Sequence, residues 1–171
     1  MLRLNSGNGM FQLHCTRDVI TETMYSLRRK NPMFKGRQTG EVQKRIENSL
    51  DEIVPDFDPS IPFAGLDEND RHVHAAAIAG GTDILLTLDK GFLNLEDQDS
   101  LPYEIFHPDD FLILVDDSSP ALVGKVTELQ RRYWADKKHH GGLEAALVKA
   151  ACPQFADRVK GHLRVQSGEK S

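Results

Sequence analysis

The segment from Asp70 to Asp89 constrains this chain most, because it predicts a helix followed directly by a strand, with a carboxylate at each end. The helix should begin near Asp70, where a carboxylate is favoured by the exposed N–H groups and the helix dipole. The alanine-rich residues 75–79 allow close packing on a sheet, and the glycines at 80–81 end the helix. Residues 84–86 should form a fully buried strand of a parallel sheet. Asp89 then lies at the carboxyl end of that strand, where open α/β sheets place their ligands.

The rest of the chain alternates between strand and helix patterns and then becomes helical. Residues 11–15 and 104–107 should be short strands, and residues 16–31 and 39–53 should be amphipathic helices. Because helices and strands alternate, we expect an α/β fold in which a parallel sheet is flanked by helices. Beyond Pro108 only helical spacing remains, which predicts a C-terminal helical extension.

Length and composition agree with a compact protein. The chain has 171 residues, a size at which roughly 70% of the unfolded surface is buried on folding. Its two cysteines, Cys15 and Cys152, fall in a predicted strand and a predicted helix and should be reduced packing residues. Neither a signal-peptide pattern nor a stretch long enough to span a bilayer is found in the sequence. We therefore expect a soluble, cytoplasmic protein that does not bind a membrane.

Charge is distributed unevenly, although the net charge is −5. Residues 1–50 hold 9 basic and 4 acidic side chains, residues 51–120 hold 2 and 17, and residues 121–171 hold 10 and 5. An acidic centre between basic flanks suits a metal-dependent nuclease, because carboxylates bind the cations while Lys and Arg bind phosphates. The alternative is that the basic residues are solvated helix faces, and charge alone does not favour the nuclease over it.

Several short motifs match one known family. Asp70 precedes the alanine-rich helix, and Thr87–Asp89 ends the strand that follows. Residues 11–16 precede a helix that carries Glu22, and residues 107–112 join the last strand to the helical extension. In these features the chain resembles the PIN-domain ribonucleases and, within them, the VapC-type toxins of bacterial toxin–antitoxin pairs, in a branch that has a C-terminal helical extension.

The resemblance implies a pocket of four acidic ligands, three of which map onto Glu22, Asp70 and Asp89. These residues would be catalytic and would bind Mg²⁺ or Mn²⁺, which activates water for attack on an RNA phosphodiester. Asp67 would add a ligand or orient one. Each acid has a structural alternative: a helix cap for Asp70, a turn former for Asp89, a surface helix residue for Glu22 and a surface loop residue for Asp67. The implied partners are an RNA substrate and a cognate antitoxin that inhibits the enzyme.

One element of the family pattern is missing. PIN domains begin with a strand that ends in an aspartate, the first metal ligand, whereas the first acidic residue here is Asp18. The resemblance therefore implies a PIN-like domain at 1–112 without its first strand and most of its first helix, a helical extension at 113–164 and a flexible tail at 165–171. Two functions stay open: a metal-dependent endoribonuclease, or an inactive binding protein that keeps antitoxin or self-association surfaces. Because loss of the strand would expose sheet edges, we expect a homodimer.

Overall fold

The computed structural model describes residues 9–63, 65, 70–136 and 142–167. The chain forms two compact units. The first unit holds Met1–Leu85 and Asn94–Glu104, and the second holds Leu86–Leu93 and Ile105–Ser171. Within the described ranges, no helix combines the length and the apolar character that are needed to cross a bilayer.

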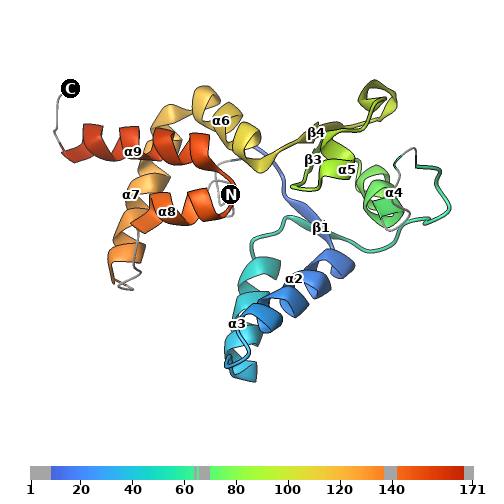
Figure 1. Ribbon diagram of the computed structural model, residues 1–171, viewed down its shortest axis with the longest axis horizontal. Coiled ribbons are helices and arrows are strands. Elements are labelled where there is room, and N and C mark those ends of the chain that lie inside the picture. The colour runs from blue at the N-terminus through green and yellow to red at the C-terminus, as the bar shows by residue number, and fades with distance from the viewer. Residues whose placement is uncertain (1–8, 64, 66–69, 137–141, 168–171) are drawn as a thin grey trace. The chain divides into compact units, whose positions relative to one another are not determined.

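Short strands and helices alternate in the first part of the chain, and helices follow them (Figure 1). In chain order the elements are β1 (His14–Thr16), α2 (Arg17–Lys30), α3 (Gly36–Glu47), β2 (Glu52–Val54), α4 (Arg71–Ala79), β3 (Ile84–Leu86), α5 (Lys90–Leu93), the 3₁₀ turn η2 (Gln98–Ser100), β4 (Glu104–Phe106), α6 (Pro108–Ser118), α7 (Pro120–Asp136), α8 (Gly142–Lys149) and α9 (Pro153–Ser167). The predicted α/β fold with helices after it is confirmed.

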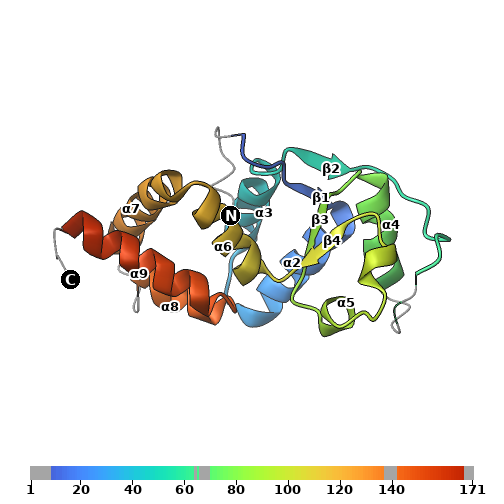
Figure 2. The same cartoon turned by 90° about the horizontal axis from the view of Figure 1, so that it is seen from above.

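Strands β1 and β2 form a parallel pair in the first unit, as Figure 2 shows. In their register His14 lies opposite Glu52, and Thr16 lies opposite Val54. The backbone N–H of Leu13 donates to the carboxylate of Asp51 at 2.8 Å, which holds the start of the pair. The connection between the two strands consists of α2 and α3, so these helices form a hairpin that leaves the strand pair and returns to it.

Strands β3 and β4 form a second pair. The N–H of Glu104 donates to the carbonyl of Asp83 at 2.9 Å, and the N–H of Thr87 donates to the carbonyl of Phe106 at 3.1 Å. Both bonds advance in the same direction along the two strands, so this pair is parallel as well. In the described part of the chain the parallel strands are therefore divided between two small sheets.

Helix α2 follows the sequence prediction closely. Thr16 is its N-cap, and its hydroxyl accepts the N–H of Val19 at 3.2 Å. Ile20 and Met24 are buried, as the apolar spacing predicts, and Asn31 is the C-cap. Local signals were sufficient here because the cap, the apolar face and the stop all lie within one stretch of sequence.

Two predicted elements differ from the structure. The predicted helix at 39–53 ends at Glu47, and residues 52–54 form β2 instead. Ile53 pairs with Cys15 across the sheet, a long-range contact that helical periodicity cannot reveal. The residues of β3 are only half-buried, so the prediction of a fully buried strand is wrong. The reason is that β3 has a single hydrogen-bonded neighbour, β4, among the described strands.

Each unit has its own buried side chains. In the first unit the three alanines at 75–77 are 0–6% exposed, which confirms that this face of α4 packs closely, and Gly80 caps the helix. In the second unit α9 packs against α6, α7 and α8. Val123 of α7 and Val159 of α9 are each 1% exposed there. The C-terminal helices therefore bury a hydrophobic core of their own.

Candidate functional site

Asp70 lies at the N-terminal end of α4, where the sequence predicted the helix to begin, and it is half-buried. Its own backbone is helical, with φ −81° and ψ −12°. A side chain that caps a helix normally extends from a residue in the β region, and in the described part of the chain the Asp70 carboxylate makes no capping hydrogen bond to α4. The predicted helix boundary is therefore confirmed, and the alternative role of Asp70 as a side-chain cap of α4 is not supported.

His74 fixes α4 one turn after Asp70. Its ring is 4% exposed, its Nδ1 lies 2.7 Å from the hydroxyl of Tyr103, and Phe63 stacks on it with ring centroids 5.0 Å apart. Burial lowers the pKa of His74 and raises the pKa of Tyr103 to about 12. The imidazole is thus neutral and the phenol is protonated near pH 7, and the two groups share one hydrogen bond between Nδ1 and the hydroxyl. This arrangement holds the helix that carries Asp70 without a buried charge.

Asp89 lies three residues after the end of β3 and directly precedes α5. Its carboxylate accepts the N–H of Gly91 at 2.6 Å, and its own N–H donates to the Thr87 hydroxyl at 3.0 Å. These bonds form a tight turn that sets the direction of the side chain. Because a carboxylate has about four acceptor positions, one N–H bond leaves acceptor capacity for a ligand. Asp89 is exposed to solvent.

Glu22 lies in the middle of α2, between the buried residues Ile20 and Met24, and its side chain is exposed. Asp67 lies outside the described residues. Glu22 and Asp70 belong to the first compact unit, whereas Asp89 belongs to the second.

The chemistry of these acids suits a hard divalent cation, because all of them offer carboxylate oxygens, the ligands that Mg²⁺ and Mn²⁺ prefer. The type of donor therefore fits such an ion. Within the described ranges, however, the structure does not bring three His, Cys, Asp or Glu side chains together as metal ligands.

The cysteines are free thiols, half-buried at Cys15 and buried at Cys152. Burial raises the pKa of both thiols, with the nearby Asp109 carboxylate as a further cause at Cys152. A raised pKa keeps a thiol protonated and unreactive near neutral pH. The cysteines therefore act in packing and are poor nucleophiles.

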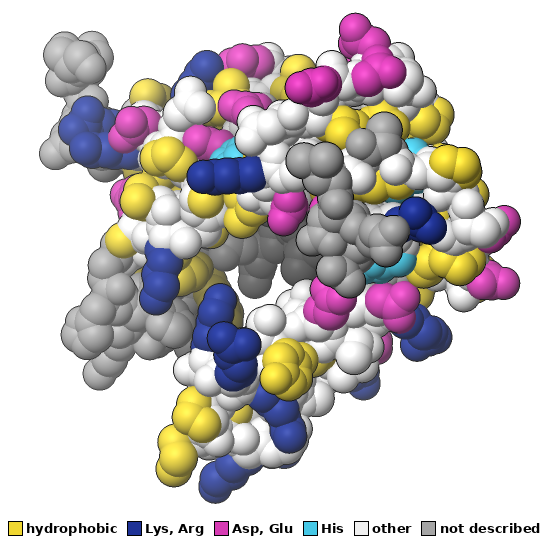
Figure 3. Space-filling model, turned by 45° about the vertical axis from the view of Figure 1, so that its right-hand side comes forward, with side chains coloured by type: hydrophobic (Ala, Val, Ile, Leu, Met, Phe, Trp, Pro, Cys, Tyr) yellow, Lys and Arg dark blue, Asp and Glu magenta, His cyan; other side chains and the backbone are white. Residues whose placement is uncertain are grey.

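The basic residues of the N-terminal part gather on the α2–α3 hairpin. Figure 3 shows Lys and Arg side chains along this arm, with hydrophobic side chains beside them. The exposed cations include Arg28, Arg29 and Lys30 in the last turn of α2, together with Lys35 and Arg37 at the start of α3. The basic N-terminal flank of the sequence thus becomes a localised surface.

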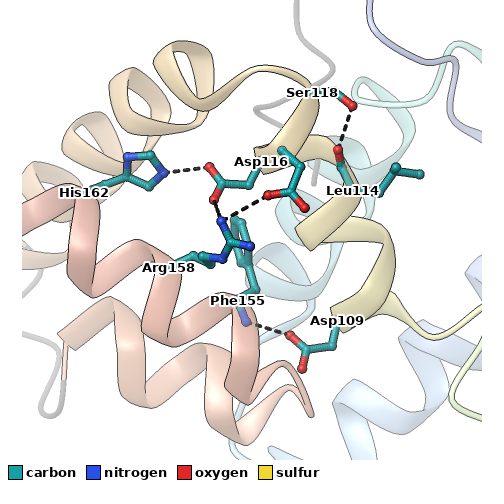
Figure 4. Close-up of polar contacts among 8 residues, drawn as sticks. Asp109, Leu114, Asp116, Ser118, Phe155, Arg158 and His162 are labelled. Atoms are coloured by element: carbon teal, nitrogen blue, oxygen red, sulfur yellow. Dashed lines mark hydrogen bonds and ion pairs between the residues drawn. The ribbon is translucent and has the colours of Figure 1, made fainter.

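A buried polar cluster in the second unit was missed by the sequence reasoning. Asp109 and Asp116 of α6 are each 3% exposed, and their carboxylates face α9 (Figure 4). Asp116 lies 2.6 Å from Nε2 of His162 and 3.5 Å from Nη1 of Arg158. The seven-residue spacing of the two acids, on the same face as the buried Leu112, was the available signal. The cluster joins two helices and is structural.

Comparison with known proteins gives one match. A family model described as PIN domain matches residues 6–91, about half of the chain. The matched segment contains all four candidate acids, Glu22, Asp67, Asp70 and Asp89. No curated protein and no solved structure matches the chain.

Proposed function

The chain belongs to the PIN-domain family, a family of nucleases, and from this premise we propose that it is a metal-dependent endoribonuclease of the VapC toxin type. The observation that carries the proposal is the position of the family match, which includes every acid that the sequence motifs single out. The basic flank on α2 and α3 also supports an anionic substrate, because Lys and Arg bind phosphates.

In this proposal Glu22, Asp70 and Asp89 hold a Mg²⁺ or Mn²⁺ ion, with Asp67 as a further ligand. Such an ion, when bound, supplies activation of water and neutralisation of the charge that develops on a phosphodiester. The protein keeps the ligands in place: the Asp89 turn orients its carboxylate through the Gly91 N–H, and the His74–Tyr103 bond holds the helix of Asp70. A cognate antitoxin inhibits the enzyme, and the chain assembles as a homodimer.

The test is cleavage of total RNA by the purified chain with Mn²⁺, with Mn²⁺ plus excess EDTA, and in two variants, Asp70→Asn and Asp89→Asn. We expect cleavage by the native chain only with free Mn²⁺, and a loss of at least about 100-fold in each variant, because each removes one carboxylate ligand. Asp99→Asn is the matched control, since Asp99 is an exposed acid of η2 outside the family match.

Three outcomes would contradict the proposal. Cleavage that persists in EDTA would show that the reaction does not depend on a metal ion. An equal loss of cleavage in Asp99→Asn would indicate a general effect of charge. No cleavage by the native chain, with RNA or a partner protein still bound, would assign the chain to the alternative function, that of a binding protein. The homodimer is tested separately by light scattering at micromolar concentration, where a monomer would contradict it.

A further inference from the structure

One end of the α2–α3 hairpin carries a concentration of positive charge. Residues 23–40 contain five cations and no acid, in a chain whose net charge is −5. We define the basic tip as these five exposed residues together with the exposed aromatic residue of α2: Tyr25, Arg28, Arg29, Lys30, Lys35 and Arg37. A local excess of one charge in an otherwise acidic chain directs a polyanion to that surface.

The two helix ends form one continuous surface. Nη2 of Arg28, near the end of α2, lies 4.0 Å from the position that a Cβ on Gly36 would occupy, in the first turn of α3. Arg37 pairs with Glu41 at 3.6 Å and still has a side chain that is 86% exposed. The other four cations have no acidic partner among the described residues, so their charge is available to a ligand.

Helix stability does not explain these positions. Cations suit the C-terminal end of a helix, which accounts for the basic residues in the last turn of α2. Lys35 and Arg37 lie at the opposite kind of end, the N-terminus of α3, where a positive charge is unfavourable and where the first turn carries no acid. The charges of these two residues therefore oppose the dipole of their own helix, which points to a role outside it.

An exposed aromatic side chain lies among the cations. Tyr25 is 67% exposed and shares a helix face with Arg28 and Arg29, three and four residues further on. Met33, in the connection between the helices, is 90% exposed. A stacking ring flanked by guanidinium groups is the combination by which proteins bind unpaired bases and their phosphates.

We infer that the basic tip binds single-stranded RNA, with the cations on the phosphates and Tyr25 stacked on a base. The inference rests on the proposed function for the identity of the polyanion, since RNA is the substrate named there. The basic tip lies entirely within the first unit. Because its proposed role is to bind RNA, that role can be measured under conditions in which no RNA is cleaved.

The first experiment measures the Kd of a fluorescein-labelled single-stranded RNA of about 20 nucleotides by anisotropy, with EDTA present to stop cleavage. The variant is Lys30→Gln/Lys35→Gln, and the matched control is Lys149→Gln/Lys160→Gln, which removes two exposed lysines from the second unit. We expect the first variant to bind about 10-fold more weakly at low salt. The slope of log Kd against log salt concentration should also decrease by about one or more, because at least one phosphate contact is lost. The control should bind like the native chain.

The second experiment separates stacking from charge. Tyr25→Ala should weaken binding by about 10-fold with an unchanged salt dependence, because no charge is lost. Tyr25→Phe keeps the ring and should bind like the native chain. Since the Tyr25 side chain is exposed, neither variant should alter folding, which circular dichroism checks.

The outcomes distinguish this inference from the proposed function. RNA binding that depends on the basic tip, in a chain that does not cleave, would support the inference and contradict the nuclease. Cleavage together with equal Kd values in both lysine variants would support the nuclease and overturn the inference. Binding to vesicles of phosphatidylcholine and phosphatidylserine that needs the basic tip, without binding to RNA, would assign the surface to a membrane and also overturn it.

Discussion

The carboxylate of Asp109 accepts the backbone N–H of Phe155 at 2.8 Å, a residue 46 positions further along the chain. It also accepts the N–H of Gln154 at 3.0 Å (Figure 4 shows the bond to Phe155). These N–H groups belong to the first turn of α9, which has no acid of its own in that turn. Asp109 thus supplies from α6 the capping group that a serine or aspartate before α9 would normally provide.

Removal of this capping group should destabilise the second unit. We expect Asp109→Ala to lower the free energy of unfolding by about 2 kcal/mol, as measured by urea denaturation, because the buried N–H of Phe155 and the part-buried N–H of Gln154 lose their acceptor. Asp110→Ala is the control: Asp110 is the exposed neighbour in the same first turn of α6, so both variants lose the same favourable dipole interaction. Equal losses in the two variants would contradict the long-range cap.

A second prediction concerns the charges around Asp116. His162→Ala should lower the free energy of unfolding by about 1–3 kcal/mol, because the carboxylate that it contacts is 3% exposed and loses its nearest partner. Asp117→Ala should cost less than about 1 kcal/mol, although Asp117 also binds Arg158 at 3.0 Å, since Asp117 is exposed. A larger cost at Asp117 would contradict the importance of burial in this cluster.

The His74–Tyr103 bond predicts a pH dependence of stability. Burial lowers the pKa of His74 below its ordinary value of 6.5, so the unfolded chain binds a proton more readily than the folded chain. The contribution of His74 is therefore complete above pH 6.5 and is lost as the pH falls below it, towards the pKa of the folded state. Urea denaturation between pH 7.5 and 5.5 should show a decrease that is smaller in His74→Gln. The same decrease in both proteins would assign the effect to other groups.

Two glycines, Gly81 after α4 and Gly40 inside α3, test how backbone conformation affects stability. Gly81 has φ +55°, and nothing lies within 4 Å of the Cβ that an alanine would add, so Gly81→Ala should cost about 1 kcal/mol from backbone strain alone. Gly40 lies inside α3 with equally open space, and Gly40→Ala should stabilise the protein by about 0.5–1 kcal/mol. Thermal unfolding of both variants checks the opposite signs, and a gain at Gly81 would contradict the positive φ.

The sequence predicted those features whose causes are local. The Thr16 cap and the apolar face with Ile20 define α2, and the glycines after Ala79 end α4. The division of the strands into two pairs, and the short strand at residues 52–54, depend on pairing between distant segments, such as Ile53 with Cys15. Hydrophobic periodicity carries no information about such partners.

The candidate site shows the same limit. The order of acids and elements around Asp70 and Asp89 was sufficient to suggest the family, which the match over residues 6–91 bears out. The hydrogen bonds of Asp89 with Gly91 and of His74 with Tyr103 were not predictable, because each depends on side-chain directions that spacing does not give. The assignment of Glu22, Asp67, Asp70 and Asp89 as ligands stays a prediction.

Because β1 pairs directly with β2, the α2–α3 segment between them begins and ends at the same strand pair. A cut in the connection near Met33, the most exposed of the large hydrophobic side chains described, would leave each helix joined to its own strand and both strands still bonded to each other. The nicked protein would run as two fragments on a denaturing gel and as one particle on a sizing column. The same geometry makes residues 32–34 a suitable place for an inserted tag or for new termini in a circular permutant.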